Sequence, residues 1–82
     1  MNIEKKVKEI LSKLSGVETV VNEATLQGDL GLDSLYMIAL LINIEETFEI
    51  ELDESDMNPF DLKTVQDVIN LIKKYCDGGN YE

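Results

Sequence analysis

Histidine is absent from this chain of 82 residues, and cysteine, proline and aromatic residues are scarce. The imidazole ring exchanges protons near neutral pH, so its absence excludes a Ser-His-Asp triad, a Cys-His dyad and histidine-ligated zinc. Cys76 is the single cysteine, which excludes an intramolecular disulfide. Asp53, Glu54 and Asp56 are close in sequence but lack the ligand order of an EF-hand loop. We therefore expect neither an enzyme nor a metal site.

Long apolar runs are also missing. No stretch approaches the roughly 20 apolar residues of a membrane span, and the N-terminus lacks the apolar core of a signal peptide. We expect a cytoplasmic protein without a membrane span. A chain of 82 residues is expected to form a single domain over residues 1–82 with a small core, ending in a frayed tail at residues 77–82.

Positive charge is rare and unevenly placed. Seven Lys stand against seventeen Asp and Glu, giving a net charge of −10. All the lysines lie toward the two ends, so residues 14–62 carry acids and no base. This pattern argues against a nucleic-acid partner, which would need clustered cations, and favours basic protein partners. Solubility alone would also explain the acids. We expect a monomer.

What is abundant is apolar residues at helical spacing. The periodicity predicts helices over residues 3–14, 34–49 and 65–75, with Thr64 and Asp67 as a capping box before the last. Residues 16–33 read as a long loop pinned by its aliphatic side chains, and residues 50–63 as one short helix or turn. The predicted fold is all-α, with three longer helices and one short one. Its expected core residues are Val7, Ile10, Leu11, Leu14, Leu41, Ile44, Phe48, Val65, Val68, Ile69 and Ile72.

The second predicted helix is apolar nearly all round. One arc, which we expect to face the core, holds Met37, Leu41, Ile44 and Phe48, flanked by Ile38 and Leu40. The opposite half holds Leu35, Tyr36, Ala39 and Ile42. Either the long loop or the short helix covers that half, or it is a strip on which partner proteins dock, fringed by Glu45, Glu46 and Glu49.

Ser34 lies where the long loop meets the second helix. Helix N-termini present unpaired N–H groups and the positive end of the dipole, so a negative group on the Ser34 hydroxyl would be stabilised without a basic side chain. Asp33 is placed to cap the helix, and Gly31 permits a tight approach in the turn. The alternative is that Asp33 and Ser34 simply form a helix cap.

The segment Asp29-Leu30-Gly31-Leu32-Asp33-Ser34-Leu35, in this arrangement of helices, resembles the acyl carrier proteins over residues 3–75. The resemblance implies a four-helix bundle in which Ser34 receives 4'-phosphopantetheine from coenzyme A, within an attachment motif of Gly31, Asp33 and Leu35. It also implies that a phosphopantetheinyl transferase attaches the arm, and that the arm's thiol carries an acyl group between synthase enzymes. An aminoacyl or peptidyl carrier of the same fold is an alternative, as is an acidic helical adaptor without a prosthetic group.

Two features depart from the carriers of general fatty-acid synthesis. Tyr36 and Ala39 stand where those carriers usually have acids, and the connection from Leu52 to Thr64 is slightly longer. We therefore expect a carrier of a specialised pathway, polyketide-like or aminoacyl-loading, whose acyl-loading and acyl-transferring enzymes have basic or apolar docking surfaces. The docking residues that we expect are Leu35, Tyr36, Ala39, Ile42, Glu45 and Glu46.

Overall fold

The computed structural model describes residues 2–56 and 61–77, and its helices are α1 (Ile3–Ser15), α2 (Ser34–Phe48), the 3-10 helix η1 (Glu54–Asp56) and α3 (Val65–Asp77). The all-α prediction is confirmed. The short fourth helix is only a 3-10 turn, and part of the segment in which it was expected, residues 57–60, lies outside the described residues. α3 extends to Asp77, the first residue of the expected tail. Residues 78–82 are not described.

The first helix is defined by local signals at both ends. The Asn2 side chain accepts a hydrogen bond from the Lys5 N–H at 3.0 Å and caps the N-terminus. Gly16 has φ of 80°, and its N–H donates to the Ser12 carbonyl at 2.8 Å. This left-handed glycine ends the helix directly after Ser15.

α2 ends without a glycine. Glu49 takes the left-handed conformation with φ of 55°, and the Ile50 N–H reaches back to the Glu45 carbonyl at 3.1 Å. The prediction that the helix includes residue 49 was one residue too long. The Glu45 carboxylate then accepts the Leu52 N–H at 2.9 Å, so this side chain fastens the start of the connection to α3.

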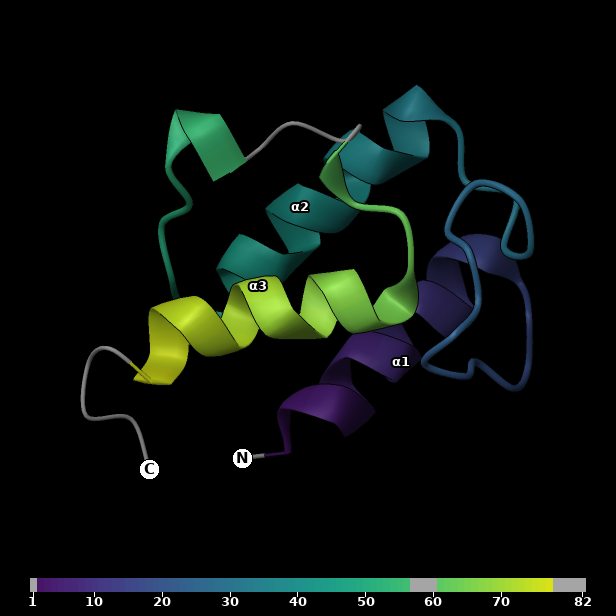
Figure 1. Ribbon diagram of the computed structural model, residues 1–82, viewed down its shortest axis with the longest axis horizontal. Coiled ribbons are helices and arrows are strands. Elements are labelled where there is room, and N and C mark those ends of the chain that lie inside the picture. The colour runs from purple at the N-terminus through teal and green to yellow at the C-terminus, as the bar shows by residue number, and fades with distance from the viewer. Residues whose placement is uncertain (1, 57–60, 78–82) are drawn as a thin grey trace.

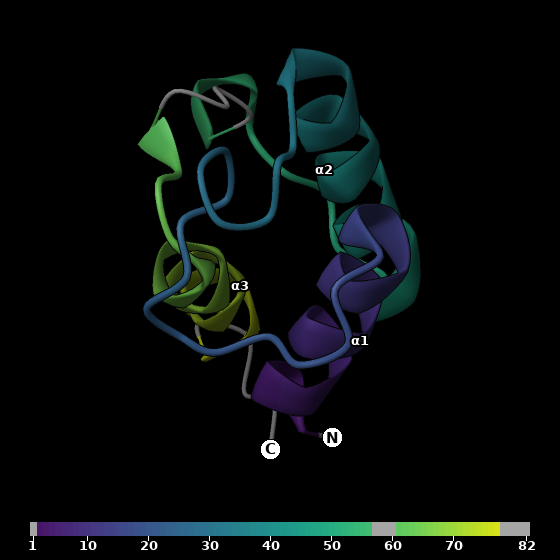
Figure 2. The ribbon, with the colours of Figure 1, turned by 90° about the vertical axis from the view of Figure 1, so that its right-hand side faces the viewer.

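The three α-helices surround one cluster of buried side chains. α1 packs against both α2 and α3, and in Figure 1 α3 crosses in front of α2. Figure 2, turned by 90°, shows α3 nearly end-on, opposite α1 and α2, with the loop of residues 16–33 passing between them. The predicted core is confirmed, except that Ile10 and Leu14 are only partly buried.

The long loop is largely held by its own aliphatic side chains, as predicted. The buried ones are Val20, Leu26, Leu30 and Leu32, and Val17 is partly buried. Val21 was also expected to pin the loop, but half of its surface is exposed. Val20 occupies the core at this point, and the adjacent residue faces outward.

The N-terminus of α3 carries the predicted capping box. The Asp67 N–H donates to the Thr64 hydroxyl at 3.3 Å, and the Asp67 carboxylate accepts the Thr64 N–H at 3.1 Å. The same oxygen accepts the Lys63 N–H at 3.0 Å. These backbone hydrogen bonds favour the charged carboxylate and lower the pKa of Asp67.

At its other end α3 holds η1. The Tyr75 hydroxyl donates to the Asp56 carboxylate at 2.6 Å and accepts the Asp53 N–H at 2.8 Å. Lys74 Nζ lies 3.1 Å from the same carboxylate. The hydrogen bonds from Tyr75 and Lys74 lower the pKa of Asp56. The Asp56 carboxylate therefore links η1 to the C-terminal end of α3.

Candidate functional site

Ser34 is the first residue of α2, and its side chain is exposed. The capping role belongs to its neighbour. The Asp33 carboxylate accepts the Tyr36 N–H at 3.0 Å, and the Asp33 carbonyl accepts the Met37 N–H at 2.9 Å. The predicted cap by Asp33 is therefore confirmed, and it leaves the Ser34 hydroxyl available for chemistry.

Two amides at this helix end remain open to a ligand. Among the residues that the structure describes, the N–H groups of Ser34 and Leu35 have no acceptor. Unpaired amides and the positive end of the helix dipole attract negative charge. A phosphate ester on Ser34 would therefore lie next to hydrogen-bond donors, although the described residues that line this place include no basic side chain.

The loop before Ser34 is anchored on both sides of Gly31. The side chains of Leu30 and Leu32 are 6% and 2% exposed, and the Leu32 N–H donates to the Leu26 carbonyl at 2.9 Å. Gly31 has φ of 68°, and a Cβ there would meet no atom within 4 Å. The expected reason for this glycine was wrong, because it provides a left-handed backbone rather than room for a close approach.

A hydrogen-bonded turn supports this loop from below. The Thr25 N–H donates to the Asp29 carboxylate at 2.9 Å, and the Asp29 N–H donates to the Thr25 hydroxyl at 2.8 Å. The Leu26 N–H donates to the Lys63 carbonyl at 2.8 Å, and the Val65 N–H donates to the Ala24 carbonyl at 3.0 Å. The loop that carries Ser34 is thus tied to the start of α3.

A shallow depression opens beside the serine. Its lining residues are Gln27, Gly31, Leu32, Asp33 and Ser34. The open surface leaves room for a prosthetic arm that must extend into solvent. The exposed hydroxyl, the two amides and this depression together fit a phosphopantetheine group on Ser34.

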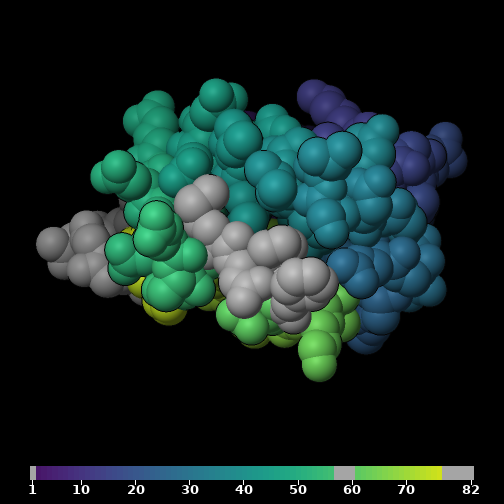
Figure 3. Space-filling view, turned by 90° about the horizontal axis from the view of Figure 1, so that it is seen from above, coloured from purple at the N-terminus to yellow at the C-terminus, as the bar shows by residue number. Residues whose placement is uncertain are grey.

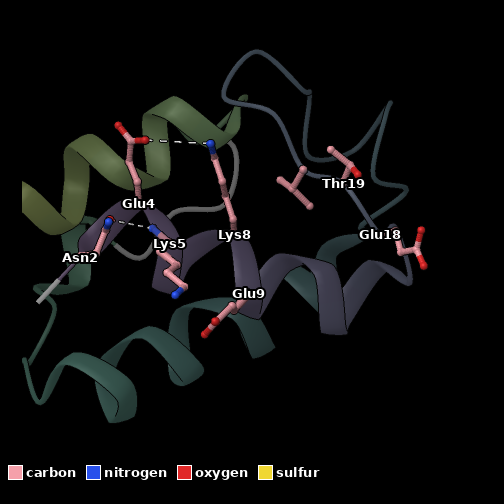
Figure 4. A pocket seen from close by; sticks show the side chains of 8 residues that line it. Asn2, Glu4, Lys5, Lys8, Glu9, Glu18 and Thr19 are labelled. Carbon is pink, nitrogen blue, oxygen red and sulfur yellow. Dashed lines mark hydrogen bonds and ion pairs between the residues drawn. The ribbon is translucent and has the colours of Figure 1, made fainter.

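Another depression, between the first half of α1 and the start of the long loop, shares no residue with the one at Ser34. Its lining mixes acids with lysines, and Lys8 Nζ lies 4.0 Å from Glu4 Oε1 (Figure 4). Mixed charges that pair with one another do not select an anion or a cation.

The expected docking residues have different surroundings. Leu35 is 77% exposed, Tyr36 48% and Ile42 46%, so neither the loop nor η1 covers this side of α2. Ala39 is partly buried, and Glu46 is exposed. Glu45 is partly buried, and its carboxylate is already engaged by the Leu52 N–H.

Ile38 was expected to flank the core, but 46% of its surface is exposed. On a helix Ile42 lies between Leu35 and Ile38 in angle, and all three are exposed on one face.

Within residues 2–56 and 61–77, no group of His, Cys, Asp or Glu side chains could hold a metal ion. In the same residues, no helix is long and apolar enough to cross a membrane.

Comparison with known proteins agrees with the site. The family model described as a phosphopantetheine attachment site matches residues 5–72. An acyl carrier protein of Desulforapulum autotrophicum is 44% identical over 77 residues, covering 90% of this chain and 97% of that one. An acyl carrier protein of Buchnera aphidicola subsp. Schizaphis graminum is 42% identical over 73 residues, covering 87% and 90%.

A solved structure shows the same fold. The crystal structure of an acyl carrier protein from Thermotoga maritima superposes with a TM-score of 0.75 at 28% identity, covering 93% of each chain. The family carries acyl groups on a phosphopantetheine arm and does not catalyse their reactions. Because the family model matches residues 5–72 and these relatives match nearly the whole chain, the chain belongs to the acyl carrier proteins of the phosphopantetheine-attachment family.

Proposed function

We propose that Ser34 is the residue to which 4'-phosphopantetheine is attached. The main support for this proposal is that two adjacent residues at the start of α2 have separate roles. Asp33 caps the helix through its carboxylate, while the adjacent Ser34 is exposed beside two amides without a described acceptor. Gly31 and Leu35 complete the proposed attachment motif.

Attachment makes Ser34 Oγ the nucleophile. The oxygen forms a phosphodiester bond to the phosphopantetheine phosphorus of coenzyme A, and the bond to the departing adenosine bisphosphate breaks. The chain has no histidine to accept the hydroxyl proton, so the transferase supplies the base. After attachment, the amides of Ser34 and Leu35 lie beside the phosphate and stabilise its charge.

The bound arm ends in a thiol, which holds the acyl group as a thioester. This chain contributes by positioning the tethered acyl group. A rigid helix start on a small domain holds the tethered group near any enzyme that docks, so weak docking suffices at the resulting effective concentration.

Partner enzymes dock, in this proposal, on the exposed side of α2. The residues are Leu35, Tyr36, Ala39, Ile42 and Glu46, and Glu45 contributes only if it leaves Leu52. The partners are the phosphopantetheinyl transferase and the acyl-loading and acyl-transferring enzymes of a specialised pathway, with basic or apolar docking surfaces. We place the protein in the cytoplasm as a monomer with a single domain.

The test is intact-mass measurement after incubation with coenzyme A and a broad-specificity phosphopantetheinyl transferase. The wild-type chain should gain the mass of one phosphopantetheine, and Ser34→Ala should gain none. Ser55→Ala, which removes an exposed hydroxyl from η1, is the matched control and should be modified like the wild type. A modified Ser34→Ala variant would refute the assignment. An unmodified wild type would favour an adaptor without a prosthetic group.

A further inference from the structure

The depression beside Ser34 is the first surface that an arm attached there would meet. Its volume is about 460 Å³, and its lining residues are Gln27, Gly31, Leu32, Asp33 and Ser34 itself. Small-molecule sites in proteins commonly have volumes of roughly 300–1,000 Å³. Figure 3 shows the blue atoms of the loop beside the teal atoms of α2 on one face of the molecule. The loop thus forms most of the wall, and α2 contributes the attachment residue.

Gln27 is the side chain of this depression whose hydrogen-bonding groups are unused. Gly31 has no side chain, and Leu32 is buried. The Asp33 carboxylate already accepts the Tyr36 N–H. Gln27 is exposed, and its carboxamide has no hydrogen-bond partner among the residues that the structure describes.

The chain has one other glutamine, which differs in this respect. Gln66 Oε1 accepts the Asn22 amide at 2.7 Å, and Gln66 Nε2 donates to the Asn70 carboxamide oxygen at 3.0 Å. The carboxamide of Gln66 is therefore used within the fold, whereas that of Gln27 is left to water or to a ligand.

Hydrogen bonds close the turn that carries Gln27. Thr25 and Asp29 exchange two of them, at 2.9 and 2.8 Å, and the Leu30 N–H donates to the Thr25 carbonyl at 3.0 Å. Gly28 permits this closure, because a Cβ there would lie 2.6 Å from the Thr25 hydroxyl oxygen. The backbone at Gln27 is thus already ordered, so a contact from its side chain costs little further backbone entropy.

We infer that Gln27 binds the phosphopantetheine arm by exchanging hydrogen bonds with an amide group of the arm. A carboxamide has N–H donors and a carbonyl acceptor, and the amides of the arm have the same two kinds of group. Gln27 is also neutral, so it does not repel the phosphate as one more acid in residues 14–62 would. This inference rests on the proposed attachment at Ser34.

The contact restrains the arm without trapping it. A hydrogen bond in an open depression competes with water, so its net contribution is small. The part of the arm next to the phosphate lies against Gln27 in the free carrier, and a docked enzyme withdraws it at little cost. The thiol at the far end stays accessible.

NMR of the holo protein, in which Ser34 carries the arm, tests this inference. The side-chain amide protons of Gln27 should show nuclear Overhauser contacts to the methyl groups of the arm, and those of Gln66 should show none. The arm amides should have order parameters above about 0.6 in the wild type and below that value, in the range of flexible chains, in Gln27→Leu.

Glu23→Leu is the matched control, because Glu23 is an exposed long side chain of the same loop that does not line the depression. Its arm amides should keep the wild-type order parameters. Gln27 is exposed and its carboxamide makes no contact within the described fold, so Gln27→Leu should keep the wild-type circular dichroism spectrum and Tm.

The two proposals fail separately. If intact-mass measurement shows that the wild type gains no arm on Ser34, the proposed function fails. If the arm is attached but its amides are equally mobile in the wild type and in Gln27→Leu, the inference alone is overturned. Absence of contacts between Gln27 and the arm, or an equal loss of order in Glu23→Leu, would overturn it as well.

Discussion

Asp67 is the side chain on which the start of α3 most depends. Its carboxylate accepts the Lys63 and Thr64 N–H groups, and its own N–H donates to the Thr64 hydroxyl. Loss of a helix cap costs about 1 kcal/mol, and hydrogen bonds to a charged group are stronger than neutral ones. We expect Asp67→Ala to lower the free energy of unfolding by roughly 1–2 kcal/mol. In a domain of this size that corresponds to a fall in Tm of roughly 5–15 °C.

The effect of Asp67 should depend on pH with a definite sign. Its backbone donors hold the pKa of the folded state below the ordinary value of 3.8. A group with a depressed folded pKa contributes stability that is fully present above its unfolded pKa and is lost as the pH falls through the folded one. The difference in stability between the wild type and Asp67→Asn should therefore be constant above about pH 5 and should shrink below about pH 4.

Urea titrations followed by circular dichroism at several pH values measure this difference. Glu51→Gln removes one negative charge from an exposed position in the connection and controls for the change in net charge. Equal stability of Asp67→Asn and the wild type at neutral pH would refute the reasoning. So would a difference that grows as the pH falls from 5 to 2.

Three further predictions concern packing and the connection. Phe48→Ala should lower the free energy of unfolding by about 3–5 kcal/mol in urea titrations, because the ring is 4% exposed and its removal leaves a cavity. Gly28→Ala should cost about 1–3 kcal/mol, because the new Cβ would lie 2.6 Å from the Thr25 hydroxyl; an unchanged Tm would contradict this. Tyr75→Phe should speed hydrogen exchange at the Asp53 amide, measured by NMR, because that N–H donates to the lost hydroxyl.

The helices could be predicted because their signals are local. A period of 3.6 residues marks a buried face wherever the chain is amphipathic, and it found the core side of all three α-helices. Caps are equally local. Asp33 lies directly before α2, and Thr64 and Asp67 are three residues apart, so both arrangements can be recognised from sequence alone.

What the sequence did not reveal depends on contacts between distant segments. The Asp56 carboxylate meets Tyr75 nineteen residues away, and the Glu45 carboxylate reaches over the end of its own helix to Leu52. No periodicity encodes such a pairing, so the sequence did not reveal that Glu45, an expected docking residue, also accepts the Leu52 N–H. Val21 illustrates the same point in the loop, where no regular spacing decides which aliphatic side chain turns inward.

Within α2 the limit of prediction was different. The helix is apolar on nearly every side, so its pattern predicted the centre of the buried arc but not the boundary between the buried and exposed faces. Ile38 was placed on the wrong side of that boundary, whereas Leu35 was placed correctly. A helix of this kind needs its neighbours to define its faces.

We propose that the arm is attached to Ser34 and to no other hydroxyl of this chain. Fragmentation mass spectrometry of the chain after reaction with coenzyme A and a phosphopantetheinyl transferase tests it most directly. We expect phosphopantetheine on the peptide that contains Ser34, with Ser12, Ser15 and Ser55 unmodified. Finding the group on any of those three serines, with Ser34 unmodified, would contradict it.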